Sequence, residues 1–360
     1  MRSSFEKKTF LDQIHRTRLD HRNYRDHERV VFGSDAETGL STIIAIHDTR
    51  LGPAFGGCRM WPYNDFDDAL ADALRLSHGM TYKNALAGLD FGGGKAVIVG
   101  DPARHKTPAL MTAFGRHVDQ LGGSYITAED VGLTPADMEA ISQGTNHVRG
   151  TARNRRGDPS PHTALGVYHG MRAALKHAFG DRRLRGRTVS IQGLGNVGYA
   201  LARLLHDAGA KLVVSDISRD AVERAMHAFG SEWVEPHDAH RVRADIFAPC
   251  ALGAGLNDET IAELEAPIVA GSANNQLAED RHGIALLERS VLYAPDYVVN
   301  AGGVIALARP DLSDMALEAE IRKIGKTLAA VFARADTEGL PTQEIADRIA
   351  EERLSAAPSH

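Results

Sequence analysis

The spacing of apolar residues changes along the first 150 residues, and each spacing predicts a different element. Residues 29–48 contain two apolar runs, in VVFG and STIIAIHD, around the polar segment 35–39, which predicts two β-strands joined by a turn. From residue 67 to residue 84 apolar side chains recur at the spacing of one helix face. The other elements predicted here are a glycine-dense loop at 88–94, a buried strand at 96–99, a helix at 107–121 and a strand at 124–127.

In the second half of the chain, predicted helices and strands alternate. The predicted elements are a helix at 163–179, a strand at 188–192, a helix at 196–208, a strand at 211–215, and further parallel strands at 244–248 and 268–270. Such alternation is typical of a doubly wound α/β sheet. From residue 312 onward the pattern is helical.

The pattern predicts an α/β protein of two domains with a cleft between them, because 360 residues exceed one typical core. The segment 150–161, GTARNRRGDPSP, predicts a hinge. We therefore expect one domain at 1–150 and a Rossmann-type domain at 151–330. The helices from about 330 to 360 are expected to return to the first domain.

Composition excludes several classes of partner. A net charge of -6 gives no reason to expect nucleic acid or an anionic membrane, and no apolar run approaches the length that spans a bilayer. The two cysteines, Cys58 and Cys250, form no CxxC or Cys/His spacing, so we expect neither a disulfide framework nor a metal site. That cysteine usage fits a cytoplasmic protein.

The segment 188–216 carries a dinucleotide-binding motif, Gly193-x-Gly195-x-x-Gly198, between a β-branched strand and an apolar helix. A second strand ends at Asp216, 216 − 198 = 18 residues after the last glycine. Asp216 can bind ribose hydroxyls and would repel a 2′-phosphate, which favours NAD, although nearby Arg219 keeps NADP from being excluded. The predicted cofactor contacts here are Gly193, Gly195, Asn196, Val197, Gly198, Asp216 and Ile217.

The first half holds two lysines among small and apolar residues, Lys83 and Lys95, in MTYKNALAGLDFGGGKAVIVGDP. A phosphate loop is excluded, because GxxxxGK[ST] would need Gly at Leu89 and Ser or Thr at Ala96. Two ammonium groups facing one cavity raise each other's cost of ionisation, so one can serve as a base while the other pairs with a substrate carboxylate. Asp130, in TAEDVG, is available to complete the site.

At these motifs the chain resembles the family of glutamate, leucine, valine and phenylalanine dehydrogenases, and is most similar to its leucine/phenylalanine branch. The matching segments are GPAFGGCRMWPY (52–63), MTYKNALAGLDFGGGKAVIVGDP (80–102), TAEDVG (127–132), SPHTALGV (160–167), GLGNVG (193–198), APCALGAGLNDETI (248–261), AGSANNQL (270–277) and YVVNAGGVI (297–305). They cover roughly residues 52 to 307 in order. The resemblance implies an NAD-dependent oxidative deamination of an L-amino acid to a 2-oxo acid and ammonia.

The resemblance also implies roles for single residues. Lys83 would bind the substrate α-carboxylate, with the backbone of Gly56 and Gly57 nearby. Lys95 would activate the water that adds to the imine, and Asp130 would relay protons. The further implied contacts are Asn275 with substrate and nicotinamide, Thr163 with the carboxamide, and Ala248, Cys250 and Asn300 lining the cofactor and substrate cleft.

The expected substrate is apolar. Phe55 stands where glutamate enzymes carry a lysine for the side-chain carboxylate, and Leu307 stands about where they carry a serine. Burying an unpaired carboxylate there would cost several kcal/mol, which disfavours glutamate. We expect leucine, valine or isoleucine, with phenylalanine as the alternative. The expected substrate pocket consists of Phe55, Met80, Ala128, Val304 and Leu307.

Two other readings remain open from the residues. A hydroxy-acid dehydrogenase would share the Rossmann half, but it normally uses a His base and an Arg clamp. A non-enzymatic NAD-binding protein is the second alternative. The family forms dimers to octamers, which implies a homo-oligomer whose helical tail takes part in assembly, with an amino acid, a 2-oxo acid and ammonia as its small-molecule partners.

Overall fold

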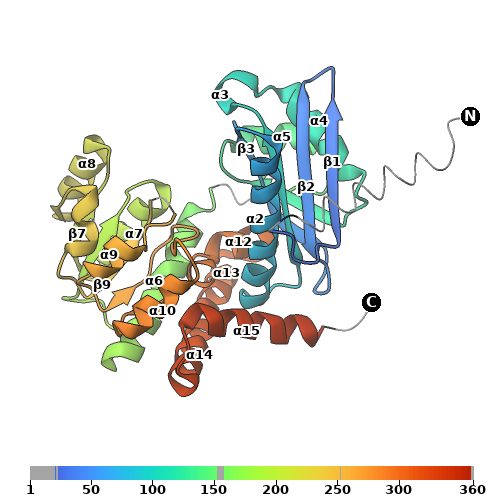
Figure 1. The fold of residues 1–360 in the computed structure, drawn as a ribbon. Coiled ribbons are helices and arrows are strands. Elements are labelled where there is room, and N and C mark those ends of the chain that lie inside the picture. Colours follow the sequence, from blue (N-terminus) through green and yellow to red (C-terminus); the bar gives the residue numbers. More distant parts are fainter. Residues whose placement is uncertain (1–20, 22, 152–157, 252, 358–360) are drawn as a thin grey trace, which may run out of the picture. The chain divides into compact units, whose positions relative to one another are not determined.

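The computed structural model describes residues 21, 23–151, 158–251 and 253–357 (Figure 1). The chain divides into two compact units. The first unit comprises residues 1–84, 90–155 and 357–360, and the second comprises 85–89 and 156–356. Residues 152–157 of the predicted hinge lie outside the described part of the chain.

A five-stranded mixed sheet forms the centre of the first unit. Its strands are β1 (Arg29–Asp35), β2 (Leu40–Asp48), β3 (Ala54–Trp61), β4 (Gly92–Val99) and β5 (Tyr125–Glu129), in the order β1-β2-β4-β3-β5. β2 pairs antiparallel with β1 and β4, whereas β3 pairs in parallel with β4 and β5. The carboxyl ends of β3 and β5 therefore lie at the same edge of the sheet.

Helices cover both faces of this sheet. They are α2 (Phe66–Leu86), α3 (Pro102–His105), α4 (Pro108–Asp119) and α5 (Pro135–Ser142). Leu70 and Leu74 of α2 pack with Ile43 and Val97 in one apolar cluster, and α2 lies along the strands in Figure 1. α4 and α5 contribute to a second cluster on the other face. Because side chains alternate between faces along a strand, successive residues of β3 point to different helices.

The predicted hairpin and helices of this unit are confirmed. The turn between β1 and β2 forms because Asp35 Oδ1 accepts hydrogen bonds from the amides of Glu37 and Thr38, each at 3.1 Å. Three elements were not predicted, β3, α3 and α5, and β4 begins at Gly92 rather than at residue 96. Glycines carry no β-propensity, so only pairing with a strand on each side holds Gly92 to Gly94 in the sheet.

A six-stranded parallel sheet forms the centre of the second unit. Its strands are β6 (Thr188–Gln192), β7 (Lys211–Ser215), β8 (Glu232–Trp233), β9 (Ile246–Pro249), β10 (Ile268–Val269) and β11 (Leu292–Tyr293), in the order β11-β10-β9-β6-β7-β8. The chain winds outward from β6 in one direction and then outward from β9 in the other. This confirms the predicted doubly wound Rossmann sheet, whose switch point lies between β6 and β9.

The second unit contains helices from α6 onward. They are α6 (Ser160–Phe179), α7 (Asn196–Asp207), α8 (Arg219–Phe229), the 3₁₀ helix η2 (Pro236–Arg241), α9 (Asp258–Ala262), α10 (Arg281–Glu288), α11 (Asp296–Val299), α12 (Gly302–Ala308), α13 (Asp314–Ile321), α14 (Lys323–Glu338) and α15 (Thr342–Ser355). The helical tail predicted from residue 312 is thus confirmed.

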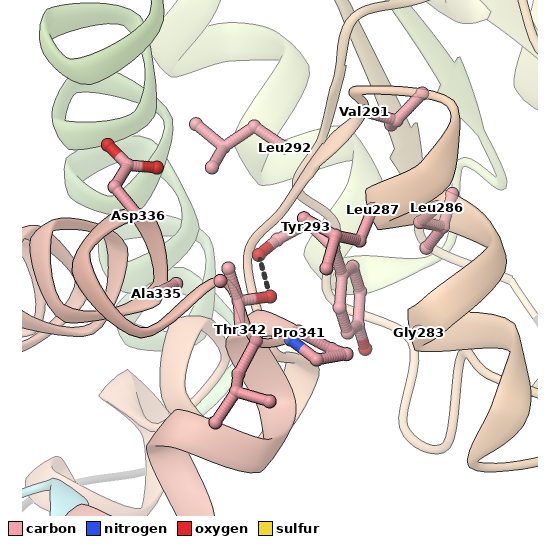
Figure 2. Close-up of a pocket in the computed structure, with 12 residues that line it drawn as sticks. Gly283, Leu286, Leu287, Val291, Leu292, Tyr293, Ala335, Asp336, Pro341 and Thr342 are labelled. Carbon is pink, nitrogen blue, oxygen red and sulfur yellow. Dashed lines mark hydrogen bonds between the residues drawn. The ribbon is translucent and has the colours of Figure 1, made fainter.

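The C-terminal helices belong to the second unit, which differs from the expected return of residues 330–360 to the first domain. A Cβ on Gly170 of α6 would lie 2.9 Å from Leu328 Cδ1, so α14 packs directly against α6. Thr342, at the start of α15, donates a hydrogen bond to the carbonyl of Tyr293 in β11 at 2.7 Å (Figure 2). The apolar face of α14 is compatible with many packing surfaces. The sequence pattern does not show that Gly170 lets α14 pack on α6. Within the described ranges, no helix is both long enough and apolar enough to cross a membrane.

Candidate active site

Glycines in β4 allow helix α2 to lie very close to the sheet. A Cβ on Gly93 would lie 2.1 Å from Thr81 Oγ1 and 2.2 Å from the Thr81 amide nitrogen. Asn84 of the same helix donates from Nδ2 to the carbonyl of Gly92 at 2.6 Å. The glycine run before Lys95 therefore serves close packing of a helix on a strand, a role unlike that of a phosphate loop.

Lys95 and Asp130 form an ion pair in the first unit. Lys95 projects from β4 and is only 6% exposed, and its Nζ donates a hydrogen bond to Asp130 Oδ2. Asp130 follows β5, and a Cβ on Gly57 would lie 2.8 Å from the Asp130 Cβ. The glycine in β3 thus leaves room for Asp130 to reach Lys95.

Two cations determine the charge of Asp130. Burial raises the pKa of this carboxyl, but the Lys95 ammonium and the Arg59 guanidinium oppose that effect and hold the pKa below its usual value. Arg59 Nε lies 3.5 Å from Asp130 Oδ2. Asp130 is therefore a carboxylate, able to accept a proton, across the neutral range.

The other predicted substrate contacts of the first unit lie on α2 and β3, the elements next to the strand that carries Lys95. Lys83 and Met80 lie in the last turns of α2, and both are partly buried. A Cβ on Gly56 would lie 1.8 Å from the Gly94 carbonyl oxygen, so β3 also needs a glycine here. The Tyr125 hydroxyl donates to the Gly56 carbonyl at 2.8 Å and fixes this stretch of backbone.

The residues predicted to select the substrate are mostly buried. Phe55 is 1% exposed, with its ring centroid 5.3 Å from that of Phe91, and Ala128 is 3% exposed. In the second unit, Val304 and Leu307 lie one helical turn apart on α12. All four are apolar side chains, so neither unit offers a partner for a substrate carboxylate at these positions.

The glycine motif of the second unit forms the turn between β6 and α7. Gly193 has φ of 101°, a conformation that suits glycine, and its amide donates to the Ser215 carbonyl at 2.7 Å. A Cβ on Gly198 would lie 2.0 Å from the Gly193 oxygen, whereas one on Gly195 would meet nothing within 4 Å. Gly195 and Asn196 are exposed, and Val197 follows them in the first turn of α7. This helix start fits the pyrophosphate of a dinucleotide.

The backbone around the motif holds the Asp216 carboxylate in place. Its Oδ2 accepts a hydrogen bond from the Leu194 amide at 2.6 Å, and its Oδ1 accepts one from the Ser218 amide at 2.8 Å. Each oxygen keeps a lone pair for a ribose hydroxyl. The neighbouring Ile217 is 92% exposed, so its apolar side chain is available to a bound ligand.

Arg219 has partners other than a ligand phosphate. Its Nη2 lies 2.7 Å from Glu235 Oε1, and its guanidinium carbon lies 4.2 Å from the centroid of the Trp233 ring. Arg219 is the residue that kept NADP from being excluded on the sequence. In the structure it is paired with an acid and packed on an aromatic ring.

Two asparagines follow the sheet of the second unit. Asn300 donates from Nδ2 to Asn274 Oδ1 at 2.8 Å and to the Ser272 carbonyl at 3.1 Å, and its buried Oδ1 receives no hydrogen bond from the described residues. Asn275 has φ of 53°, and its amide donates to Asp296 Oδ2 at 2.8 Å. A buried acceptor in need of a donor fits a carboxamide ligand such as nicotinamide.

The three remaining predicted contacts differ in how accessible they are. Thr163, in the first turn of α6, donates from Oγ1 to the Pro159 carbonyl at 3.2 Å. Cys250 follows β9, is partly exposed, and donates from its amide to the Gln192 carbonyl at 2.7 Å. Ala248 is 0% exposed inside the sheet, so it reaches a ligand only through its neighbours.

Arg59 and its partner Asp72 are the residues that the sequence reasoning missed. Arg59 lies in β3, an element that was not predicted, and donates from Nη1 to Asp72 Oδ2 at 2.8 Å. A guanidinium among the small and apolar residues of GPAFGGCRMW was the signal that could have indicated it.

A hollow of about 430 Å³ in the second unit lies apart from these residues. Figure 2 shows leucine and valine side chains of α10 and the β11 region around Tyr293. Its lining includes no residue predicted for the site. Over the described part of the chain, no group of three or more His, Cys, Asp and Glu side chains is arranged to hold a metal ion.

Two family descriptions match most of the chain. Residues 27–147 match "Glu/Leu/Phe/Val dehydrogenase, dimerisation domain". Residues 158–221 and 216–309 match "Glutamate/Leucine/Phenylalanine/Valine dehydrogenase".

Curated relatives and solved structures agree with these matches. The chain is 54% identical to a leucine dehydrogenase of Geobacillus stearothermophilus, over 91% of each chain. It is 47% identical to a valine dehydrogenase of Streptomyces virginiae, covering 94% of this chain and 97% of that one. The crystal structure of an L-tryptophan dehydrogenase from Nostoc punctiforme is similar with a TM-score of 0.82 and 42% identity, covering 96% of this chain and 99% of that one.

Proposed function

The chain belongs to the Glu/Leu/Phe/Val dehydrogenase family, and we propose that it catalyses the reversible, NAD-dependent oxidative deamination of leucine, valine or isoleucine. The membership confirms the resemblance found in the sequence. Relatives about half identical to this chain are named leucine and valine dehydrogenases, which supports a branched-chain substrate. The observation that carries the chemistry is the buried Lys95–Asp130 ion pair.

The proposed reaction divides the work among three side chains of the first unit. Lys83 pairs with the α-carboxylate of the substrate and orients it. Lys95 first gives up its ammonium proton to solvent, and the neutral amine then takes a proton from the water that adds to the imine. Asp130 accepts and returns protons as ammonia leaves. Lys95 is buried and the Asp130 side chain is 21% exposed, so the access of bulk water to these transfers is limited.

The second unit fits NAD as the cofactor. NAD, when bound, accepts the hydride that leaves the substrate Cα. The amides at the start of α7 would hold its pyrophosphate, and the anchored Asp216 would receive the ribose hydroxyls. The unpartnered Oδ1 of Asn300 would accept from the carboxamide, near the proposed contacts Asn275 and Thr163.

An apolar side chain is proposed for the substrate because of what surrounds Phe55. The ring is buried against Phe91, and no cation replaces the lysine of the glutamate enzymes at this position. A substrate carboxylate would lose its hydration without gaining a partner. We therefore assign the side-chain pocket to Phe55, Met80, Ala128, Val304 and Leu307.

The remaining proposals concern the whole protein. We propose that the first unit binds the amino acid and the second binds NAD, with the active form a homo-oligomer of two to eight chains. The match of residues 27–147 to a dimerisation domain supports assembly. Cys58 and Cys250 are free thiols, which supports a place in the reducing cytoplasm.

The decisive experiment follows NADH oxidation with 4-methyl-2-oxopentanoate, with and without ammonium. We expect turnover that depends on ammonium. Lys95→Ala should abolish it while NADH still binds, and Lys83→Ala should mainly raise KM for the 2-oxo acid. Lys323→Ala, which removes a surface lysine paired with Glu320, is the matched control and should retain full activity. Absence of ammonium-dependent turnover on every 2-oxo acid tested would refute the proposal.

An aromatic L-amino acid is the second candidate. The solved relative from Nostoc punctiforme is titled a tryptophan dehydrogenase, and the Phe55 and Phe91 rings offer a surface for stacking. Comparing kcat/KM for branched-chain and aromatic 2-oxo acids decides between the two candidates. A higher value for phenylpyruvate would favour the aromatic substrate.

A further inference from the structure

Arg59 reaches the Lys95–Asp130 pair from the adjacent strand β3. Its Nε lies 3.5 Å from Asp130 Oδ2, the oxygen that also receives the Lys95 ammonium. This Nε is buried and has no hydrogen-bond partner among the described residues. The N–H group is therefore within reach of Asp130 but lacks the close geometry of a full hydrogen bond.

The other end of the guanidinium is held firmly. Arg59 Nη1 donates to Asp72 Oδ2 at 2.8 Å, and the Tyr63 hydroxyl donates to the same oxygen at 2.8 Å. Arg75 donates from Nη2 to the other Asp72 oxygen at 2.8 Å. The Nη1 end of Arg59 is thus held by Asp72 of α2. Its Nε–H, which has no hydrogen-bond partner among the described residues, lies near Asp130.

Few charged groups face Asp130. Lys95 approaches it from β4 and Arg59 from β3, while Cys58 of β3 and Tyr125 of β5 are neutral because burial raises the pKa of each. The Tyr63 hydroxyl, also neutral, and the Asp72 carboxylate stand behind Arg59. When Lys95 turns to a substrate, the Arg59 guanidinium is still a cation within 3.5 Å of Asp130 Oδ2.

We propose that Arg59 is a positioning residue for Asp130: its Nε–H binds the carboxylate when Lys95 leaves it, so that Asp130 stays ionised and in place during the proton transfers. A partly buried carboxylate without a cation would take up a proton from solvent and lose its function as an acceptor. The inference rests on the proposed dehydrogenase function, because it requires Lys95 to act on a substrate.

The test measures reductive amination of 4-methyl-2-oxopentanoate across pH 5 to 9 in Arg59→Gln and Arg59→Lys. Arg59→Gln keeps a donor for Asp72 and removes the charge. We expect kcat to fall about tenfold at neutral pH and its acid limb to move up by roughly one pH unit. The limb of kcat/KM should move less, because Lys95 still holds Asp130 in the free enzyme. Arg59→Lys should restore most of the wild-type kcat profile.

Two controls separate positioning from folding. Arg183→Gln removes an 81% exposed guanidinium of the second unit that is paired with Asp181, so activity and pH profile should stay unchanged. Combining Arg59→Gln with Asp130→Asn should move the acid limb no further than Asp130→Asn alone. An equal loss of kcat at every pH in Arg59→Gln, or a lower melting temperature with an unmoved limb, would overturn the role of Arg59. A wild-type protein without ammonium-dependent turnover would instead overturn the proposed function, and this inference with it.

Discussion

Phe55 is the residue proposed to stand where the glutamate enzymes of the family carry a lysine for the substrate side chain. The sequence alone left open whether its ring shrinks the pocket or stacks on an aromatic substrate. In the structure the ring is buried against Phe91, so we expect it to form part of the wall of the proposed side-chain pocket. A ring in this position is expected to limit the size of the substrate side chain more than it attracts one.

Replacing this ring should therefore change specificity. In Phe55→Leu we expect kcat/KM for the leucine-derived 2-oxo acid to rise about tenfold relative to the valine-derived one, because a methylene in an apolar pocket is worth ~1–3 kcal/mol. Phe114→Leu is the matched control, since Phe114 is 0% exposed in the cluster under the opposite sheet face and should lose stability without a change in that ratio. An unchanged ratio in Phe55→Leu would remove Phe55 from the pocket.

Discrimination between NAD and NADP depends on Asp216 and on the engagement of Arg219. We expect Asp216→Ser to tighten NADPH binding about tenfold, or ~1.4 kcal/mol, by removing the repulsion of a 2′-phosphate. Adding Glu235→Gln should tighten it further, because Arg219 loses its ion pair and can turn to the phosphate. The double variant Asp216→Ser with Arg219→Gln should lack this further tightening of NADPH binding. Titration of NADPH fluorescence measures each Kd, and no effect of Glu235→Gln would contradict the role of the ion pair.

At the scale of elements, His47 of strand β2 and His27, which precedes β1, both contact helix α2. His47 Nδ1 lies 2.8 Å from Thr81 Oγ1, and His27 Nε2 lies 2.9 Å from Ser77 Oγ. Burial lowers the pKa of His27 to about 4 and that of His47 to about 3, and the mutual repulsion of the rings and His78 adds to this. Both histidines are therefore neutral when the first unit is folded.

This contact should make the fold sensitive to acid. The unfolded histidines titrate near pH 6.5, so their contribution to stability is complete above that pH and is lost as the pH falls toward 4. We expect the free energy of unfolding to fall by up to ~1.4 kcal/mol per pH unit for each histidine in that window. His47→Gln should reduce the slope, whereas His237→Gln, 74% exposed, should leave it unchanged. Urea unfolding curves between pH 4 and 7 measure how the free energy of unfolding changes with pH. Equal slopes in His47→Gln and His237→Gln would contradict the assignment.

At the scale of the whole molecule, the prediction concerns assembly. The chain has a mass of 38.8 kDa, and a homo-oligomer predicts a mass in solution of at least twice that value. Light scattering on the purified protein measures it directly. A mass that stays at one chain across a tenfold range of concentration would refute the proposed assembly.

Sequence pattern predicted the Rossmann unit from α6 to β7, the strands β9 and β10, and the helical tail, but not β8, β11 or the helices between β7 and α13. Its parallel strands are short apolar runs between amphipathic helices, and its glycine motif depends on local backbone geometry, so both can be recognised without knowledge of the partner elements. In the first unit, β3 and the start of β4 were not predicted. β3 has two glycines, and β4 begins with three, so neither strand shows the alternation that identifies a half-buried strand.

The sequence by itself determined the fold class, the cofactor motif and the candidate residues Lys83, Lys95 and Asp130, because each depends on composition, spacing or a local turn. Tertiary structure decided what surrounds them. Arg59 meets Asp130 only because two strands that are distant in sequence pair in parallel, with glycines that let a side chain and a helix approach. Such contacts join residues across 130 − 59 = 71 positions, a separation at which no periodicity in the chain reports proximity.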